Sequence, residues 1–425
     1  MTLALMFVIL FLLLIIGAPV AVALGTASLF FIATSGMPDV VVLHNMVNGI
    51  NSFPLIAVPF FILAGHLMNS SGITTKIFAF ARATVGWMYG GLGHVNVGAS
   101  VIFAGMSGAA VADAGGLGNI EIKAMREAGY DSDFSVGITA ASSTIGPIIP
   151  PSLPLVVYGV IANASIGQLF AAGLVPGLIM AMSLMIMVAV YSRIRNYPRD
   201  DRFRGSVFLR TLVDALLPLF TPIIIVGGIL TGAFTPTEAA IAAVAYAMIL
   251  GLFVYRTLTP RRILNVSMET VETTASIMVI VAASAIFGWI LTANQVAQKF
   301  AGVLLTMTDS PTMIILVIML IVLVVGCFME TIAAITILTP VLLPVAVQMG
   351  IDPVHFGIIL ILNLMIGLLT PPVGMVLYVL SKVSGVPFER CVMATLPFLA
   401  PLLFVLLLLT FVPALSMWLP TMIYR

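Results

Sequence analysis

Long apolar runs dominate the pattern of hydrophobic and polar positions along this chain. The segments 1–16, 312–325 and 401–412 contain no charged side chain. Strands that cross a membrane alternate apolar and polar positions, so runs that are apolar throughout predict membrane helices. Hydrophobic residues make up 61% of the 425 and charged residues only 8%, unlike the composition of soluble domains. We therefore expect an all-α polytopic membrane protein.

Two clusters of glycine and proline interrupt apolar segments of the chain. The sequence reads TIGPIIPPS at 144–152 and IGLLTPPVG at 366–374, so the glycine and the paired prolines of the first cluster recur 221 positions later. Proline removes a backbone donor and blocks the preceding helical turn, which leaves carbonyl groups that lipid cannot satisfy. Two such breaks at corresponding positions predict a secondary transporter with a polar site near the middle of the membrane.

Basic residues change sides between the two halves of the chain. The loop 121–133 contains two basic residues and its counterpart 342–354 contains none, whereas the loop 159–169 contains none and its counterpart 380–390 contains two. Short cytoplasmic loops collect Lys and Arg. The reversal therefore predicts two inverted-topology repeats, because a parallel duplication would keep the same bias in both halves.

The predicted repeats cover residues 1–200 and 213–425, and an Arg-rich cytoplasmic connector at 201–212 joins them. Each repeat should contain about five transmembrane helices and one re-entrant helical hairpin. An odd number of crossings inverts the second repeat and places both termini outside the cytoplasm. Residues 72–89 place two basic side chains among apolar ones, which is typical either of an interfacial amphipathic arm or of an ordinary cytoplasmic helix.

Each repeat is expected to pair a hairpin with a broken helix. Hairpin 1 should span about 94–121 and its broken helix about 134–158, and hairpin 2 should span about 312–345 and its broken helix about 355–380. These lengths fit two half-helices that meet at a glycine turn, near Gly108 in hairpin 1. The ends of half-helices direct partial charges at whatever lies between them.

Oxygen-bearing groups gather at the breaks and at the hairpin tips. Sodium prefers oxygen ligands, which unwound backbone carbonyls and Ser or Thr hydroxyls supply without burying a formal anion. We therefore predict about two sodium sites, one in each half, and no organic cofactor. The candidate ligands are Gly105, Ser107, Ser143, Thr144 and Gly146 in the first half and Gly326, Glu330, Thr331, Gly367 and Thr370 in the second.

Three acidic residues, Asp113, Glu238 and Glu330, lie inside apolar segments. A charge within the membrane costs at least about 2.5 kcal/mol, so such residues are normally paired or functional. Glu238 follows Thr235 at the spacing of a capping box, which favours a helix cap. For Asp113 and Glu330 the sequence leaves open an ion site, a contact that stabilises the hairpin, or a simple cap.

The sequence also argues against several classes of function. It contains no GxSxG, HExxH or GxGD motif and no pair of embedded carboxylates at helical spacing, so we do not expect an enzyme. A net charge of +1 gives no indication of nucleic-acid binding. Two transport alternatives stay open: a passive channel, and a sodium/dicarboxylate carrier that needs no binding protein.

Five motifs resemble, in order, those of the large membrane (M) subunit of tripartite ATP-independent periplasmic (TRAP) transporters. They are SGAAVADAGGLGNI at 107–120, SSTIGPIIPPS at 142–152, GAFTPTEAA at 232–240, GCFMETIAAITILTPVLLP at 326–344 and GLLTPPVG at 367–374. The resemblance covers essentially the whole chain. It implies sodium-coupled secondary active import of an organic acid, of the sialic acid or C4-dicarboxylate class, by an elevator displacement of a transport domain.

The resemblance further implies partners, a location and binding residues. The partners would be a small four-helix membrane subunit, expected as a separate chain, and a soluble periplasmic binding protein that delivers a carboxylate substrate. The chain would lie among the lipids of the bacterial inner membrane with both termini in the periplasm. Gly326, Gly367 and Thr370 would form the second sodium site. Substrate contacts are expected from Ser107, Gly108, Asp113, Ser142, Ser143 and Pro147.

No Arg or Lys lies near either break. We therefore expect backbone amides, hydroxyls and the N-termini of half-helices to bind the substrate carboxylate.

Overall fold

The computed structural model describes residues 2–38, 40–198, 203–307 and 310–424, and within these residues every regular element is helical. The helices are α1 (Thr2–Ile15), α2 (Val20–Thr34), α3 (Val40–Ile50), η1 (Phe53–Ile56), α4 (Ala57–Ser70), α5 (Ile73–Val85), α6 (Gly91–Ser107), α7 (Ala110–Glu127), α8 (Ser132–Ser143), α9 (Leu153–Ile161), α10 (Ile166–Arg195), α11 (Gly205–Pro222), η2 (Ile223–Gly227), α12 (Gly228–Leu230), α13 (Pro236–Ile249), η3 (Leu250–Val254), α14 (Pro260–Ala293), α15 (Val296–Met307), α16 (Pro311–Gly326), α17 (Thr331–Gln348), α18 (Pro353–Gly367), α19 (Met375–Ser384), α20 (Phe388–Phe411) and α21 (Ala414–Ile423). The all-α fold expected from the apolar runs is confirmed.

Several described segments are long and apolar enough to cross a membrane. There are seven of them: Phe53–Ser70, Ile166–Arg195, Gly205–Leu230, Pro236–Val254, Pro260–Ala293, Thr331–Gln348 and Phe388–Phe411. The helices α1, α2 and α3 are apolar but shorter. A helix rises about 1.5 Å per residue, so about 20 residues are needed to cross the hydrocarbon core. The chain is therefore a multi-pass membrane protein.

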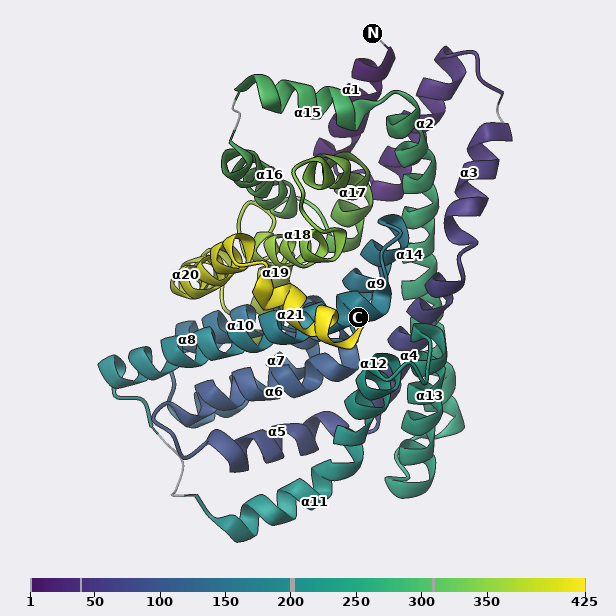
Figure 1. Cartoon of the computed structure of the whole chain (residues 1–425). Helices are drawn as coiled ribbons and strands as arrows, with labels where there is room; N and C mark the ends of the chain where they lie inside the picture. Colours follow the sequence, from purple (N-terminus) through teal and green to yellow (C-terminus); the bar gives the residue numbers. More distant parts are fainter. Residues whose placement is uncertain (1, 39, 199–202, 308–309, 425) are drawn as a thin grey trace.

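The helices run in two main directions (Figure 1). In this view α3, α13 and α14 stand upright on one side, whereas α5, α6, α10 and α11 lie across the other. Helix α14 has 34 residues and contacts α2, α3 and α4 as well as α17. It therefore joins the upright helices to α17 of the second half.

Helix bounds recur at the spacing of the two Gly/Pro clusters. Shifting α7 by 221 residues reproduces the bounds of α17. The same shift brings α6, α8, α9 and α10 close to α16, α18, α19 and α20. At equivalent positions, the Pro150–Pro151 and Pro371–Pro372 peptide bonds are both cis. Each half thus contains, in the same order, a pair of helices joined by a short turn, a broken helix and a long helix.

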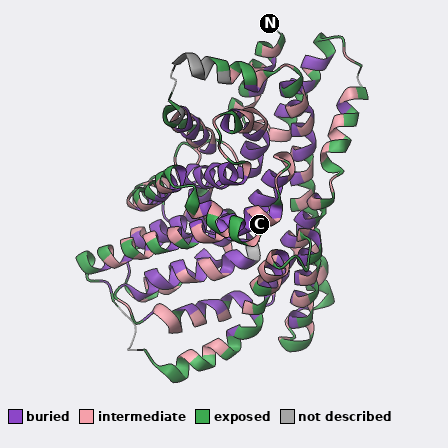
Figure 2. Cartoon of the chain, in the orientation of Figure 1, coloured by how far each residue is buried: buried purple, intermediate pink, exposed green. Residues whose placement is uncertain are grey.

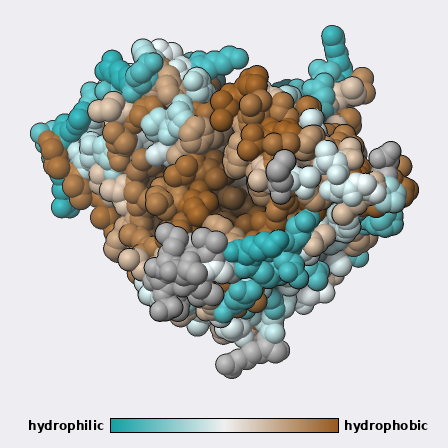
Figure 3. All heavy atoms as spheres, turned by 90° about the horizontal axis from the view of Figure 1, so that it is seen from above, coloured by the Kyte–Doolittle hydropathy of each residue, from teal (hydrophilic) through white to brown (hydrophobic). Residues whose placement is uncertain are grey.

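The two broken helices form the centre of the buried core (Figure 2). Every residue of α8 from Phe134 to Ser143 is buried, and so is every residue of α18 from Val354 to Gly367. Outer helices instead expose large apolar side chains, such as Ile15 at 85% and Ile194 at 74%. Hydrophobic residues also gather around a depression on the face seen from above (Figure 3). Exposed apolar surface of this extent suits a protein surrounded by lipid and by partner helices.

Glu238 caps the start of α13. Its carboxylate accepts a hydrogen bond from the Thr235 backbone N–H at 2.7 Å, and the Thr235 hydroxyl accepts one from the Glu238 backbone N–H at 3.3 Å. The two residues thus form a complete capping box. Glu238 therefore serves as a helix cap, as its spacing from Thr235 predicted.

Candidate functional site

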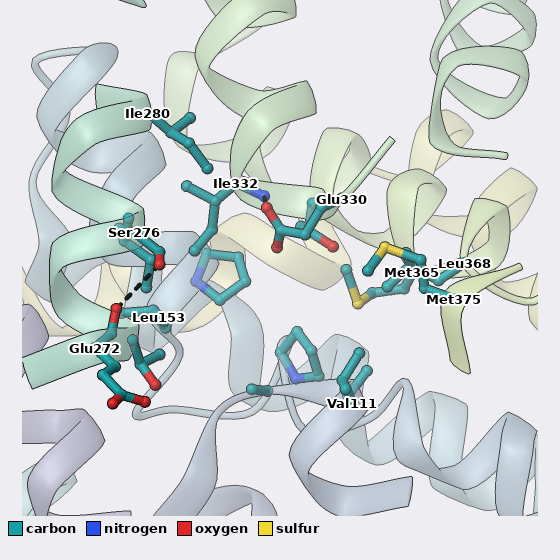
Figure 4. A pocket seen from close by; sticks show the side chains of 17 residues that line it. Val111, Leu153, Glu272, Ser276, Ile280, Glu330, Ile332, Met365, Leu368 and Met375 are labelled. Atoms are coloured by element: carbon teal, nitrogen blue, oxygen red, sulfur yellow. Dashed lines mark hydrogen bonds between the residues drawn. The ribbon is translucent and has the colours of Figure 1, made fainter. Parts of the chain in front are cut away.

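A cavity of about 470 Å³ lies where both breaks, both hairpins and α14 meet (Figure 4). The first half contributes the turn and start of α7, the break before α9 and the start of α9. The second half contributes the starts of α17 and α19 and the end of α18. The lining residues are Ala109, Ala110, Val111, Pro147, Leu153, Pro154, Glu272, Thr273, Ser276, Ile277, Ile280, Glu330, Thr331, Ile332, Met365, Leu368 and Met375.

Four helices begin at this cavity: α7, α9, α17 and α19. The first backbone N–H groups of a helix have no partner within it and carry a partial positive charge. Side chains cap two of these starts, because Ser152 accepts from Leu155 N–H at 3.2 Å and Glu330 accepts from Ile332 N–H at 2.9 Å. The starts of α7 and α19 have no side-chain cap. At α19 the Leu377 N–H donates to the Gly374 carbonyl at 2.8 Å, so the anion-binding capacity of these two starts rests on their remaining first-turn N–H groups and on the partial positive charge of the helix end.

The charged side chains of the described lining are both acidic. Glu330 extends from the start of α17, and Glu272 extends from α14 on the opposite wall, as Figure 4 shows. The Ser276 hydroxyl, one turn along α14 from Glu272, donates to the Glu272 backbone carbonyl at 3.0 Å. An anionic ligand would therefore depend on helix N-termini and hydroxyls for its positive partners.

The hydroxyl groups at the first break donate hydrogen bonds to backbone carbonyls. Ser143 donates to the carbonyl of Ala140 at 2.8 Å, and Thr144 donates to the carbonyl of Ala141 at 2.6 Å. Such hydroxyl oxygens keep lone pairs for another ligand. The turn of hairpin 1 closes against this break, since a Cβ atom added at Gly108 would collide with the Pro151 carbonyl oxygen.

At the second break, the backbones of hairpin 2 and the broken helix are in direct contact. A Cβ atom added at Gly367 would lie 2.6 Å from the carbonyl carbon of Gly326. The Val373 N–H donates to the Cys327 carbonyl at 3.3 Å. The Thr370 hydroxyl donates to the Ile366 carbonyl at 2.8 Å and keeps its lone pairs available.

The structure brings together part of the site expected from sequence. Pro147, Glu330 and Thr331 line the cavity. The remaining residues expected at the breaks are not among its lining residues: Gly108, Ser142, Ser143, Thr144 and Gly146 at the first, and Gly326, Gly367 and Thr370 at the second. The side chain of Ser107 lies outside the described part of the chain.

Two expected residues lie away from the cavity. An added Cβ at Gly105 would lie 2.6 Å from Cγ of Pro222 in α11, so this glycine faces a neighbouring helix rather than the first break. Asp113 is 2% exposed and does not line the cavity. Its carboxyl is enclosed by the hairpin instead of facing a substrate.

Sequence reasoning missed the contribution of α14 to the cavity. Glu272, Thr273 and Ser276 form one wall, and no Gly/Pro cluster indicates them. The available signal was Glu272 itself, an acidic residue four positions before Ser276 in a helix that becomes strongly apolar. Equally unexpected were the apolar lining residues Met365, Leu368 and Met375.

Comparison with protein families identifies the chain. A family model described as the DctM component of the tripartite ATP-independent periplasmic transporter matches residues 7–415. The chain belongs to the DctM family. The family resemblance of the five motifs is thereby confirmed.

Among the relatives of this DctM-family permease, the sialic acid TRAP transporter large permease protein of Vibrio cholerae is 48% identical over 409 residues, covering 96% of each chain. The sialic acid TRAP transporter permease protein of Haemophilus influenzae is 42% identical, covering 96% of this chain and 66% of that one. The C4-dicarboxylate TRAP transporter large permease protein of Pseudomonas aeruginosa is 40% identical, covering 87% and 86%.

A solved structure shares the fold of this large permease. The Alcanivorax borkumensis YdaH transporter superposes with a TM-score of 0.62 at 15% sequence identity, covering 87% of each chain. The relatives are thus named as transporters and permeases, which agrees with the expectation of a non-enzymatic protein.

Proposed function

We propose that this permease imports an organic acid together with sodium ions, and that the substrate binds in the cavity between the two breaks. The observation that carries the proposal is the meeting of two uncapped helix N-termini, those of α7 and α19, at one cavity of about 470 Å³. Helix N-termini attract anions, and this volume is within the usual range for small-molecule pockets.

Sialic acid is the first substrate to test. The two relatives of highest identity named above carry sialic acid in their names, whereas C4-dicarboxylate appears in the name of a relative at 40% identity. The lining combines acidic and hydroxyl side chains with apolar ones, Met365, Leu368 and Met375 among them. A polyhydroxylated acid with an apolar ring face would use both kinds of contact, whereas a short dicarboxylate would leave much of the volume empty.

The proposed sodium sites lie at the two breaks. At the first, Ser143, Thr144 and Gly146 would contribute; at the second, Gly326, Gly367 and Thr370 would do so, with Glu330 and Thr331 close by. Supporting this assignment, the hydroxyls of Ser143, Thr144 and Thr370 donate to helix carbonyls and so direct lone pairs elsewhere. Oxygen ligands of this kind suit a sodium ion.

An elevator movement would carry the breaks and hairpins along α14. In support, two cavities follow one another along this helix. The first includes Glu272 and Ser276, and the second, of about 390 Å³, includes Ser284, Gly288 and Thr292. Helices α9 and α17 contribute to both. Sliding of these helices against α14 would expose the substrate site to opposite sides in turn, with the repeats in inverted orientation as their charge bias predicts.

The proposed complex contains a small membrane subunit and a soluble periplasmic binding protein, in the bacterial inner membrane. The family description names a tripartite periplasmic transporter, which supports both partners. Exposed apolar side chains on α1 and α3, such as Phe11 at 55% and Val40 at 68%, offer surface for lipid or for a membrane subunit.

The decisive experiment measures uptake of radiolabelled sialic acid into liposomes that contain the complete transporter, with binding protein outside. We expect accumulation above the external concentration when sodium is high outside, and none when potassium replaces sodium or the binding protein is omitted. Downhill flux without accumulation would identify a channel. Uptake without the binding protein would identify a carrier that needs no binding protein. Accumulation of C4-dicarboxylates but not of sialic acid would show that the substrate is a C4-dicarboxylate.

A further inference from the structure

A buried polar network lies inside hairpin 1, away from the substrate cavity. The Asn96 amide nitrogen on α6 donates to a Glu121 carboxylate oxygen on α7 and to the Thr139 hydroxyl on α8, each at 2.7 Å. The Asn96 amide oxygen accepts from the Ser142 hydroxyl at 2.6 Å. These four residues are between 0% and 1% exposed. Ser142 belongs to the last turn of α8 before the first break, so the network ends at that break.

Two carboxyl groups of this region are only partly satisfied or unsatisfied by hydrogen bonds. Asp113 and Glu121 are eight positions apart on α7 and are 2% and 1% exposed. Neither oxygen of Asp113 has a hydrogen-bond partner within bonding distance among the described residues, and one oxygen of Glu121 also lacks one. The Ser100 hydroxyl lies close to Asp113, and the two carboxyl groups are near enough for their charges to interact. The expectation from sequence that no two embedded carboxylates share a helix is therefore wrong, because Glu121 is buried on the same helix as Asp113.

Basic side chains on the surrounding helices do not neutralise the pair. Helix α7 packs against α6, α8 and α19. On α7, Lys123 is exposed and Arg126 donates to the Ser384 carbonyl at 2.7 Å. On α19, Lys382 is exposed. Other titratable groups around α7 include His94 on α6, which is buried, and Glu127 on α7 and Tyr378 on α19, which are exposed. Asp131 and Asp133 at the start of α8 pair with Arg195 and Arg390, and His66 on α4 lies 3.8 Å from Glu269. Tyr130 after α7 and Cys391 on α20 are buried.

Two buried negative charges on one helix, without a cation among the described residues, would be unstable in this position. Desolvation alone costs several kcal/mol for each buried ion, and mutual repulsion adds to it. A carboxylate also normally attracts several donors, whereas three oxygens of the pair have none within bonding distance. Acidic residues held inside the membrane are typical of proton relays.

We propose that Asp113 and Glu121 form a proton-binding site that holds at least one proton at neutral pH. Binding adds a proton from water to a carboxylate and gives a neutral carboxylic acid, and release reverses this. Because Asn96 joins Glu121 to Ser142, a change in the proton load of Glu121 would alter the hydrogen bond at the end of α8. The site is independent of sodium coupling; only its effect on the first break rests on the proposed function.

Infrared difference spectroscopy of the full chain in lipid nanodiscs tests the proposal directly. Spectra are compared between about pH 6 and about pH 9, a window in which ordinary Asp and Glu side chains stay ionised. We expect a carboxylic acid C=O band that shifts in D₂O. Asp113→Asn or Glu121→Gln should remove or displace it, and the double variant should abolish it. Glu127→Gln, which changes an exposed carboxylate at the end of the same helix, should leave the band unchanged.

The absence of a deuterium-sensitive carboxylic acid band in the wild type would overturn the proposal without any variant. A band that persists in the double variant, or carboxylates that respond to added sodium chloride but not to pH, would also overturn it. As a second measurement, the wild-type Tm should fall relative to the double variant as pH rises, because deprotonation leaves unneutralised buried charge. Loss of sodium-driven uptake with these spectra intact would count against the transport function alone.

Discussion

Close backbone contact at the second break leaves no room for a side chain. A Cβ atom at Gly367 would lie 2.7 Å from Cα of Gly326 as well as 2.6 Å from its carbonyl carbon. Overpacking of this kind costs about 1–3 kcal/mol. We expect Gly367→Ala to separate hairpin 2 from the break and raise the sodium concentration for half-maximal uptake about ten-fold, a change of ~1.4 kcal/mol.

Gly25→Ala is the matched control for Gly367→Ala. No heavy atom lies within 4 Å of an added Cβ at Gly25, which is also in a helix. Its uptake curve should match that of the wild type. Equal sodium dependence in both variants would mean that the contact between Gly326 and Gly367 does not shape an ion site.

The Thr370 hydroxyl offers a second test of the sodium assignment. Thr370→Val keeps the shape of the side chain and removes the oxygen. Loss of one such contact costs about 1–2 kcal/mol, so we expect the sodium affinity for uptake to fall roughly 5–30-fold. Thr370→Ser, which retains the hydroxyl, should stay close to the wild type. An unchanged sodium affinity in Thr370→Val would remove this residue from the site.

At the scale of elements, α14 supplies the wall that faces both breaks. Ser276 lines the cavity, whereas Val279 on the same helix is 55% exposed and does not line it. We expect Ser276→Trp to reduce uptake more than ten-fold, because the indole would occupy part of the substrate volume, while Val279→Trp should transport normally. Thermal stability of both variants, measured by fluorescence, separates blocked binding from misfolding. Normal uptake by a folded Ser276→Trp protein would place the substrate elsewhere.

Helix ends explain how a cavity with acidic side chains can take an anion. Glu330 caps α17 through the N–H groups of Ile332 and Ala333, at 2.9 and 3.2 Å. Part of its charge is therefore offset by its own helix. The uncapped starts of α7 and α19 provide the positive ends that remain. In the proposed site, these helix starts would take the place of the basic side chain that the sequence lacks near the breaks.

For the whole molecule, the orientation of the repeats can be measured with cysteine labelling. Lys123 lies four residues before the end of α7, and Gln348 is the last residue of α17, the equivalent helix. Both residues are exposed. In a chain with Cys327 and Cys391 replaced by serine, we expect Lys123→Cys to react with an impermeant maleimide from the cytoplasmic side. Gln348→Cys should react from the opposite side. Labelling of both from one side would contradict inverted repeats.

Local chemistry made the breaks predictable. Each break joins a glycine to two consecutive prolines, a combination that removes adjacent backbone donors, whereas single prolines such as Pro176 and Pro340 remain inside helices. The capping role of Glu238 was equally predictable from the sequence, since a capping box needs only two residues three positions apart. Glu121 was not, because nothing in its own sequence shows that α6 and α8 exclude water from it.

The sequence by itself determined that this protein is a helical membrane protein with two equivalent breaks, and its motifs identified the family. Composition and proline act locally and need no fold to take effect. Only the tertiary structure decided that α14 completes the cavity, that two helix starts without side-chain caps open into it, and that Asp113 and Glu121 are both buried and do not line the cavity. Each of these depends on contacts between distant segments, and backbone groups that bind ligands have no signature in side-chain identity.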